Sequence, residues 1–329
     1  MPSPSRPSPA SFTSSGLPAG DQRMAGAGPA IHTQDLAKRY GAIEALAGLT
    51  MTVPRGEVFG FLGPNGAGKT TAVKLLLGLT EATAGQAWVL GSRAGDRETR
   101  RRIGYLPELF RYQSWLSARE VLTLHCELAR LPRPRWKEEI GEALQLVGLS
   151  DRADDRCGGF SKGMQQRLGL GVALLGRPEL VFLDEPTSAL DPVGRHDVRD
   201  ITRALRDRGT TVFLNSHLLS EVQMLCDRVA VVDRGRVIAI GTIDELLAGA
   251  GVLRVRVTNL GGATAGLRSF GQIDADGEWL TFRGINQDRV PDLVAELVRL
   301  GGRVHAVEAE RQTLEDRFLQ LLDPGRQDS

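Results

Sequence analysis

Residues 63–71 form a glycine-rich segment whose residue types suit the binding of a phosphate group. The segment reads Gly63-Pro64-Asn65-Gly66-Ala67-Gly68-Lys69-Thr70-Thr71 and fits the pattern G-x-x-x-x-G-K-[ST]. It follows an apolar run at 58–62, an expected buried strand, and precedes an expected helix over 71–79. Glycines let successive backbone N–H groups face an anion, and a helix N-terminus adds partial positive charge. We therefore predict that Lys69 reaches the β- and γ-phosphates of a nucleotide and that the Thr70 hydroxyl binds Mg²⁺, rather than a turn that only connects two elements.

A pair of acids at 184 and 185 could supply the carboxylates that nucleotide hydrolysis requires. Residues 180–184 are apolar up to Asp184, which predicts a buried strand that ends in a carboxylate. Because parallel strands end at one edge of a sheet, Asp184 is predicted to be the second Mg²⁺ ligand beside the phosphate loop. Glu185 would lie near the γ-phosphate, where it can orient and deprotonate a water. Adjacent acids are common on solvated strand ends, so the pair alone is weak evidence for a catalytic site. It becomes strong evidence because the same chain contains the phosphate loop.

A second candidate anion site opens the helix expected over 162–175. Ser161 and Gly163 stand at its start, where a serine can simply cap the helix through its hydroxyl group. The same hydroxyl and the free N–H groups of the first turn can also bind a phosphate. Two phosphate sites far apart in one chain predict a nucleotide held between two protomers.

Composition and charge describe an ordinary globular protein. The 329 residues exceed one average domain, and 41% are hydrophobic and 25% charged. Lys and Arg number 41 against 40 Asp and Glu, so a nucleic-acid partner is not expected. No apolar run approaches the roughly 18 residues that span a bilayer, and the longest candidate, 168–176, is stopped by Arg177. The three cysteines match no metal or redox spacing, and free thiols in a reducing cytosol are expected.

Strands and helices are expected to alternate over residues 30–248. Further strand candidates at 211–215 and 228–232, with a helix over 198–208, predict an α/β core with a largely parallel sheet. Only helix-period stripes occur over about 108–160, which predicts a helical insertion. Residues 1–29 are rich in Pro, Ser and Gly and lack the apolar core of a secretory signal, so we expect disorder.

Residues 251–323 are expected to form a small α+β domain of the split β-α-β type, followed by a polar tail at 324–329. Leu253, Val255 and Val257 alternate with arginines, as in a half-buried strand, and further strands are predicted at 278–282 and 303–307. A helix over 290–300 is expected to bury Leu293, Val294, Leu297 and Leu300. A last helix is expected over 313–322.

Taken in order, these motifs resemble those of the ATP-binding subunits of ABC transporters. The resemblance covers roughly residues 31–245 and rests on five motifs: the phosphate loop, Ser161 and Gly163 before Gln165-Gln166-Arg167, Leu183-Asp184-Glu185-Pro186, Ser188-Ala189-Leu190-Asp191, and His217. It implies a P-loop NTPase fold with a mostly parallel core sheet, an antiparallel β part and the helical insertion. It also implies ATP and Mg²⁺ as cofactors and a homodimer in which Ser161 and Gly163 cap the ATP of the partner. A separate membrane permease and a peripheral place on the cytoplasmic face of the membrane follow from the same resemblance.

The family's residue roles carry over by position. Tyr40 resembles the residue that stacks on adenine, and Asp191 the aspartate that crosses the dimer interface. His217 resembles the histidine that contacts the γ-phosphate and supports Glu185. The resemblance therefore implies that Glu185, His217 and Lys69 are the catalytic residues. Glu108 stands where the family most often has Gln, and either side chain offers an oxygen to Mg²⁺ and to the attacking water.

Two departures from the family pattern change local charge. Glu108 adds a negative charge, which should alter Mg²⁺ affinity and nearby pKa values. Phe160, Lys162 and Met164 replace the usual Leu, Gly and Gln around Ser161 and Gly163. We expect the Lys162 side chain to point to solvent rather than to add a cation near the γ-phosphate.

The C-terminal residues, which end in Leu314-Glu315-Asp316-Arg317-Phe318-Leu319, resemble the extension of bacterial ABC-2-type exporter ATPases. This favours export of a drug, antibiotic or cell-surface polymer, with the extension serving dimerisation or regulation without a ligand. The alternative is a soluble ABC-type ATPase that acts on ribosomes or DNA. Ribosome-associated members carry two nucleotide domains in one chain, and DNA-repair members carry long coiled coils, neither of which the sequence contains. A kinase or GTPase is the weaker third reading, since Ser161, Gly163 and His217 have no role there.

Overall fold

The computed structural model describes residues 28–188, 190–247, 252–260, 265–285, 287–310 and 314–322. The expectation of disorder over 1–29, apart from its last two residues, lies outside the described residues, as does the predicted tail at 324–329.

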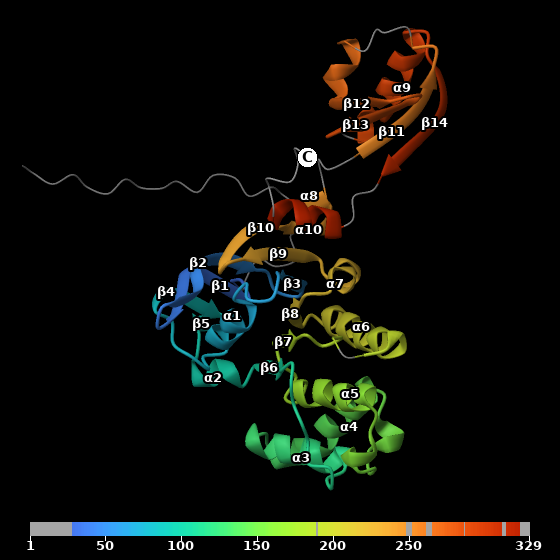
Figure 1. Ribbon diagram of the computed structural model, residues 1–329. Coiled ribbons are helices and arrows are strands. Elements are labelled where there is room, and N and C mark those ends of the chain that lie inside the picture. The colour runs from blue at the N-terminus through green and yellow to red at the C-terminus, as the bar shows by residue number, and fades with distance from the viewer. Residues whose placement is uncertain are drawn as a thin grey trace, which may run out of the picture.

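A six-stranded sheet forms the centre of the main body, in the order β10-β9-β3-β8-β7-β6 (Figure 1). Five of its strands are parallel, and β10 is antiparallel to β9. The strands are β3 (Val58–Leu62), β6 (Ile103–Leu106), β7 (Leu180–Asp184), β8 (Thr211–Ser216), β9 (Arg228–Asp233) and β10 (Arg236–Thr242). The predicted α/β class with a largely parallel sheet is therefore confirmed.

Strand β7 shows why the central strands are apolar without interruption. Leu180 and Phe182 pack into one core, and Val181 and Leu183 pack into a second core on the opposite face. A strand that is covered on both faces needs apolar side chains at every position. The second face is covered by α5 (Lys162–Ala173), α6 (Pro192–Asp207) and α7 (Leu219–Leu225), and the first by α1 (Lys69–Leu76).

A four-stranded antiparallel sheet, in the order β2-β1-β4-β5, completes the core on the side of α1. Its strands are β1 (Ile31–Tyr40), β2 (Ile43–Val53), β4 (Ala84–Val89) and β5 (Ser92–Arg93). This is the antiparallel part that the family resemblance implied. The pairing of β1 with β2 contains three register irregularities, which break the alternation of apolar residues along these strands.

Three helices form a helical region that extends from the edge strand β6, as Figure 1 shows. They are α3 (Ala118–Leu128), α4 (Trp136–Leu146) and the start of α5, preceded by the short helix α2 (Arg97–Arg100). Short 3-10 turns occur at Arg133–Arg135, Ser150–Arg152 and Cys157–Gly159. A capping box between Ser117 and Glu120 begins α3.

Residues 252–310 form a small sheet in the order β12-β13-β11-β14, covered by α9 (Val290–Arg299) and by 3-10 turns at Ala265–Phe270 and Gln287–Arg289. Its strands are β11 (Val252–Thr258), β12 (Gln272–Asp276), β13 (Trp279–Arg283) and β14 (Arg303–Glu310). This order is that of a split β-α-β fold. Leu293 and Leu297 are buried as predicted, whereas Val294 and Leu300 are only partly buried.

The last helix, α10 (Leu314–Leu322), packs on the main body against α7 and α8 (Ile243–Leu247) (Figure 1). Leu314 is buried in the same core as α5 and α6, with Phe318 and Leu321 partly buried against it. The Arg317 guanidinium donates a hydrogen bond of 3.1 Å from Nε to the Leu246 carbonyl oxygen. Helix α10 therefore closes back onto the main body and adds no described residue to the core of the small sheet.

Candidate functional site

The phosphate loop joins β3 to α1, and two of its glycines have no room for a side chain. A Cβ on Gly63 would lie 2.2 Å from the Val232 carbonyl oxygen, and one on Gly68 would lie 2.3 Å from that of Ala45. Gly68 also has a φ of 97°, in the left-handed region that glycine favours. At both positions, therefore, only glycine allows the loop backbone to lie this close to the neighbouring carbonyl oxygens.

Helix α1 begins at Lys69, two residues earlier than predicted, so Lys69, Thr70 and Thr71 all lie in its first turn. Its N-cap, Gly68, makes no side-chain capping bond, and the first turn contains no acidic residue. The helix N-terminus therefore keeps the N–H groups and partial positive charge that suit an anion.

Lys69 is buried beside the loop and faces acidic side chains. Its Nζ donates hydrogen bonds to the carbonyl oxygens of Gly63 (2.8 Å) and Pro64 (3.3 Å). Burial lowers the pKa of Lys69, and the nearby carboxylates of Glu185, Asp184 and Glu108 oppose this shift. The structure thus brings together Lys69 and the three carboxylates that the sequence nominated.

Asp184 ends β7 and is buried beside Asn215 of the neighbouring strand β8. The two residues are paired in the parallel register, and Asn215 Nδ2 donates a hydrogen bond to Asp184 Oδ1. Burial raises the pKa of Asp184, with Glu108 and Glu185 adding to the rise and Asn215 and Lys69 opposing it. Sequence reasoning did not nominate Asn215, although an amide near the end of an apolar run was a usable signal.

Glu185 adopts an unusual backbone conformation that turns its carboxylate toward His217. Its φ is 51°, and its N–H donates to the Asn215 carbonyl oxygen at 2.9 Å. Glu185 Oε2 lies 2.8 Å from His217 Nδ1, on the loop after β8, and Glu185 is only 8% exposed. A left-handed conformation at a non-glycine residue is often found at functional sites, where the surrounding structure holds it. The structure thus places the side chains of Glu185 and His217, which were predicted to act together, within hydrogen-bond distance of each other.

Glu108 lies two residues beyond the end of β6, and Leu106 of β6 is paired with Leu183 of β7. The carboxyl ends of these neighbouring strands bring Glu108 near Asp184 and Glu185, although Glu108 itself is exposed. Among the described residues, no group of three or more His, Cys, Asp or Glu side chains could hold a metal ion. A carboxylate and a hydroxyl suit Mg²⁺ as oxygen ligands, so Asp184 and Thr70 fit the metal if nucleotide phosphates complete its shell. Asn215 Oδ1, buried next to Asp184 without a hydrogen-bond partner, marks this corner as polar.

Tyr40 is the last residue of β1 and presents an exposed ring. Lys38 Nζ lies 4.9 Å from the centre of that ring. An exposed aromatic ring at a strand end can stack on a planar base.

Ser161 and Gly163 lie away from the phosphate loop, at the start of α5. Ser161 Oγ accepts a 3.2 Å hydrogen bond from the Met164 N–H, so the serine caps the helix. Both residues line a hollow of about 320 Å³ with Lys162 and Asp191, and this hollow includes no residue of the phosphate loop. Helices α1 and α5 are well separated in Figure 1. The two sets of predicted phosphate-binding residues in one chain therefore lie apart rather than in one site.

Asp191 belongs to the half-site of Ser161. Its Oδ1 accepts a 2.7 Å hydrogen bond from the Gly194 N–H and so caps α6. Because of this cap and Pro192 at the first helical position, α6 begins six residues earlier than the predicted 198.

Comparison with known proteins places these motifs in a family. A family model described as ABC transporter matches residues 46–188. An uncharacterized ABC transporter ATP-binding protein of Nostoc sp. is 39% identical over 304 residues, which cover 89% of each chain. The chain belongs to the ATP-binding proteins of ABC transporters. The daunorubicin resistance ATP-binding protein DrrA3 of Streptomyces coeruleorubidus is 40% identical over 90% of this chain and 97% of its own.

The structure of this ABC ATP-binding protein is similar to the solved structure of an ATP-binding subunit of an ABC transporter, with a TM-score of 0.60. The two sequences are 31% identical, and the match covers 66% of this chain and 91% of the other. As a member of this family, the protein is an ATPase that powers transport through a separate permease. No helix in the described ranges is long and apolar enough to span a bilayer.

Proposed function

We propose that this ABC ATP-binding protein works as a head-to-tail homodimer that powers export. The observation that carries the proposal is the separation of the two half-sites: Lys69, Asp184 and Glu185 lie together, whereas Ser161 and Gly163 line a different hollow. ATP bound to the phosphate loop of one protomer would be capped by Ser161 and Gly163 of the other. Closure of the dimer would complete the site, and hydrolysis would reopen it.

Each residue near the loop has a proposed role that follows from its chemistry. Lys69 balances phosphate charge, and Glu185, held by His217, orients and deprotonates the attacking water. Thr70 and Asp184 would hold Mg²⁺, with Glu108 beside them; when bound, the ion neutralises charge on the β- and γ-phosphates. Tyr40 would stack on adenine, and Asp191 would contact the partner protomer.

Export, rather than import, is favoured by a relative and by the C-terminal residues. The daunorubicin resistance protein aligns over 90% of this chain, well beyond the 31–245 stretch of shared motifs. By analogy the cargo would be a drug or antibiotic. The protein would lie at the cytoplasmic face of the membrane, attached to a separate permease that pull-down from native membranes should recover.

Glu185→Gln tests the proposed roles directly. The amide keeps the size of the side chain but cannot accept the proton of the water, so hydrolysis should fall at least about tenfold. ATP binding should persist, and an ATP-bound dimer should accumulate, measured by light scattering with and without ATP. Glu98→Gln, a surface acid that pairs with Arg101, is the matched control and should leave both quantities unchanged. Full turnover in Glu185→Gln would show that Glu185 does not deprotonate the attacking water.

A further inference from the structure

The link between α5 and β7, residues 174–179, connects the two half-sites along the chain. Helix α5 begins beside Ser161, and β7 ends at Asp184. Within the link, Gly176 and Arg177 are consecutive residues in the left-handed region, with φ of 82° and 52°. If α5 caps the nucleotide of the partner, α5 and the link form the covalent path from Ser161 and Gly163 to Asp184, in addition to the shorter path from Glu185 to Asp191.

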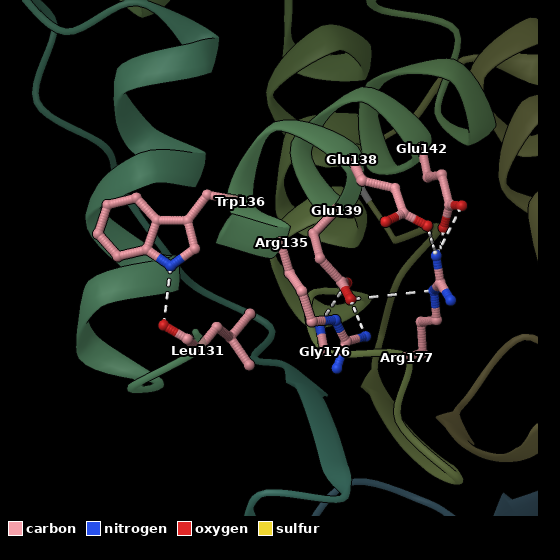
Figure 2. A network of polar contacts seen from close by, with 8 residues as sticks. All are labelled: Leu131, Arg135, Trp136, Glu138, Glu139, Glu142, Gly176 and Arg177. Carbon is pink, nitrogen blue, oxygen red and sulfur yellow. Dashed lines mark hydrogen bonds and ion pairs between the residues drawn. The ribbon is translucent and has the colours of Figure 1, made fainter. Parts of the chain in front are cut away.

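A buried carboxylate on α4 holds this link in place. Glu139 is 3% exposed, and its Oε2 accepts a 3.0 Å hydrogen bond from the Gly176 N–H (Figure 2). Its Oε1 accepts a hydrogen bond from the Arg135 guanidinium and lies 3.9 Å from Arg177 Nε. The Arg177 guanidinium also contacts Glu138 at 2.5 Å and Glu142 at 2.8 Å.

The members of this network are not equivalent. Arg177, Glu138 and Glu142 have side chains about half exposed, where solvent and salt screen ion pairs strongly. Glu139 is buried, so the Gly176 N–H and the two arginines must replace the water that its carboxylate has lost. Glu139 is therefore the member that holds the backbone of the link.

The far end of the link is tied to the central sheet. Glu179 accepts hydrogen bonds from Arg102, just before β6, at 2.5 Å, and from Arg55, just before β3, at 2.9 Å. Its backbone N–H also donates to the Arg102 carbonyl oxygen at 2.9 Å. The link is thus held by the helical region at Gly176 and by the sheet at Glu179.

Apolar packing around the link is incomplete. A pocket of about 350 Å³ lies between α4, the link and the end of α6, and Glu139, Arg177 and Leu205 are among its lining residues. Close-packed contacts fix the relative orientation of elements, and a pocket lacks those contacts. Polar ties consequently contribute more to the orientation of α5 relative to β7 here than they would in a filled core.

We propose that Glu139 is a positioning residue that, through Gly176, sets the orientation of α5 relative to β7 and so couples the two nucleotide sites of the dimer. The inference rests on the proposed head-to-tail dimer. Disrupting the contact between Glu139 and Gly176 should uncouple the two nucleotide sites without removing any group that touches the nucleotide.

Glu139→Gln is the direct test, with Glu142→Gln as its matched control on the same helix. The amide that replaces the Glu139 carboxylate has one acceptor oxygen instead of two, so it cannot accept from both the Gly176 N–H and Arg135, and it lacks the charge that balances Arg135 and Arg177. In Glu139→Gln, the Hill coefficient for ATP hydrolysis should fall to about 1 and kcat should fall about fivefold or more. The affinity of the isolated protomer for a fluorescent ATP analogue should stay within about twofold. Glu142→Gln should keep the wild-type values of all three.

Arg177→Gly is a second variant that guards against misfolding, because glycine adopts a φ of 52° without strain. It removes the guanidinium that lies 3.9 Å from the buried Glu139 carboxylate and helps to balance its charge, so it should lower the Hill coefficient in the same direction. Wild-type cooperativity and kcat in both folded variants would overturn the inference, as would an equal loss in Glu142→Gln. A wild-type protein that dimerises and hydrolyses ATP without cooperativity would also overturn it. A wild-type protein that fails to dimerise with ATP would instead contradict the proposed function.

Discussion

The carboxylate of Asp184, which we propose binds Mg²⁺, is ionised at a cost in stability because it is buried. Burial, with Glu108 and Glu185 nearby, raises the pKa of Asp184 above its usual value. A raised pKa means that the folded state favours the protonated form. The contribution of protonated Asp184 to the free energy of unfolding is therefore complete below the pKa that Asp184 has in the unfolded chain. It is lost as pH rises through the higher pKa that Asp184 has in the folded state.

Asp184→Asn should consequently make the nucleotide-free protein more stable at neutral pH. The amide is neutral and keeps an oxygen that can accept from Asn215, so the Tm should rise while hydrolysis falls at least about a hundredfold. Thermal unfolding at pH 5 and pH 8 measures the effect, and the gain should be larger at pH 8. A lower Tm at pH 8 would show that the ionised carboxylate stabilises the fold.

Glu108→Gln should shift the acid limb of the ATPase pH profile to lower pH. Removing the Glu108 carboxylate lowers the pKa of Asp184, so Asp184 stays ionised and able to bind Mg²⁺ at lower pH. The measurement is kcat/KM against pH at saturating Mg²⁺, compared with the surface control Glu98→Gln. An unchanged acid limb would mean that Asp184 does not govern it.

Helix α10 shows that a terminal element can belong to a core distant in sequence. Its buried Leu314 packs with α7 and α8, whereas Leu319 on the same helix is 57% exposed. We expect Leu314→Ala to reduce the free energy of unfolding by about 2–4 kcal/mol, since it leaves a cavity. Leu319→Ala should change it by less than about 0.5 kcal/mol. Urea denaturation of both variants measures the difference, and equal effects would argue against the docking of α10.

If the whole molecule carries two incomplete nucleotide half-sites, as we propose, its activity should depend on its concentration. Specific ATPase activity should rise with protein concentration and level off as the ATP-bound dimer saturates. Ser161→Ala should keep ATP binding by the protomer but lower the plateau about tenfold or more, because it removes a hydroxyl from the capping half-site. Activity that is independent of concentration in a proven monomer would contradict the dimer.

Four strands of the six-stranded sheet were predictable because each is buried on both faces and reads as a short apolar run. Strands β3, β7, β8 and β9 were located to within one residue at each end. Strands β1, β2, β4 and β10 were not located, because exposed positions and register shifts interrupt their apolar pattern. Strands β5 and β6 were also not located, because β5 has only two residues and two of the four residues of β6 are only partly buried. Strand β12 was also missed, since Ile273 is its only large apolar residue.

The sequence by itself determined the half-sites, because the phosphate loop, the strand ending in Asp184 and the cap at Ser161 are local patterns of neighbouring residues. The family resemblance implied that His217 supports Glu185, but only the tertiary structure decided which other distant groups meet: Asn215 at Asp184, Glu139 at Gly176 and α10 on α8. These partners are more than 30 residues apart in sequence. Their contacts depend on strand register and helix packing, which arise from the summed burial of many side chains rather than from any short motif.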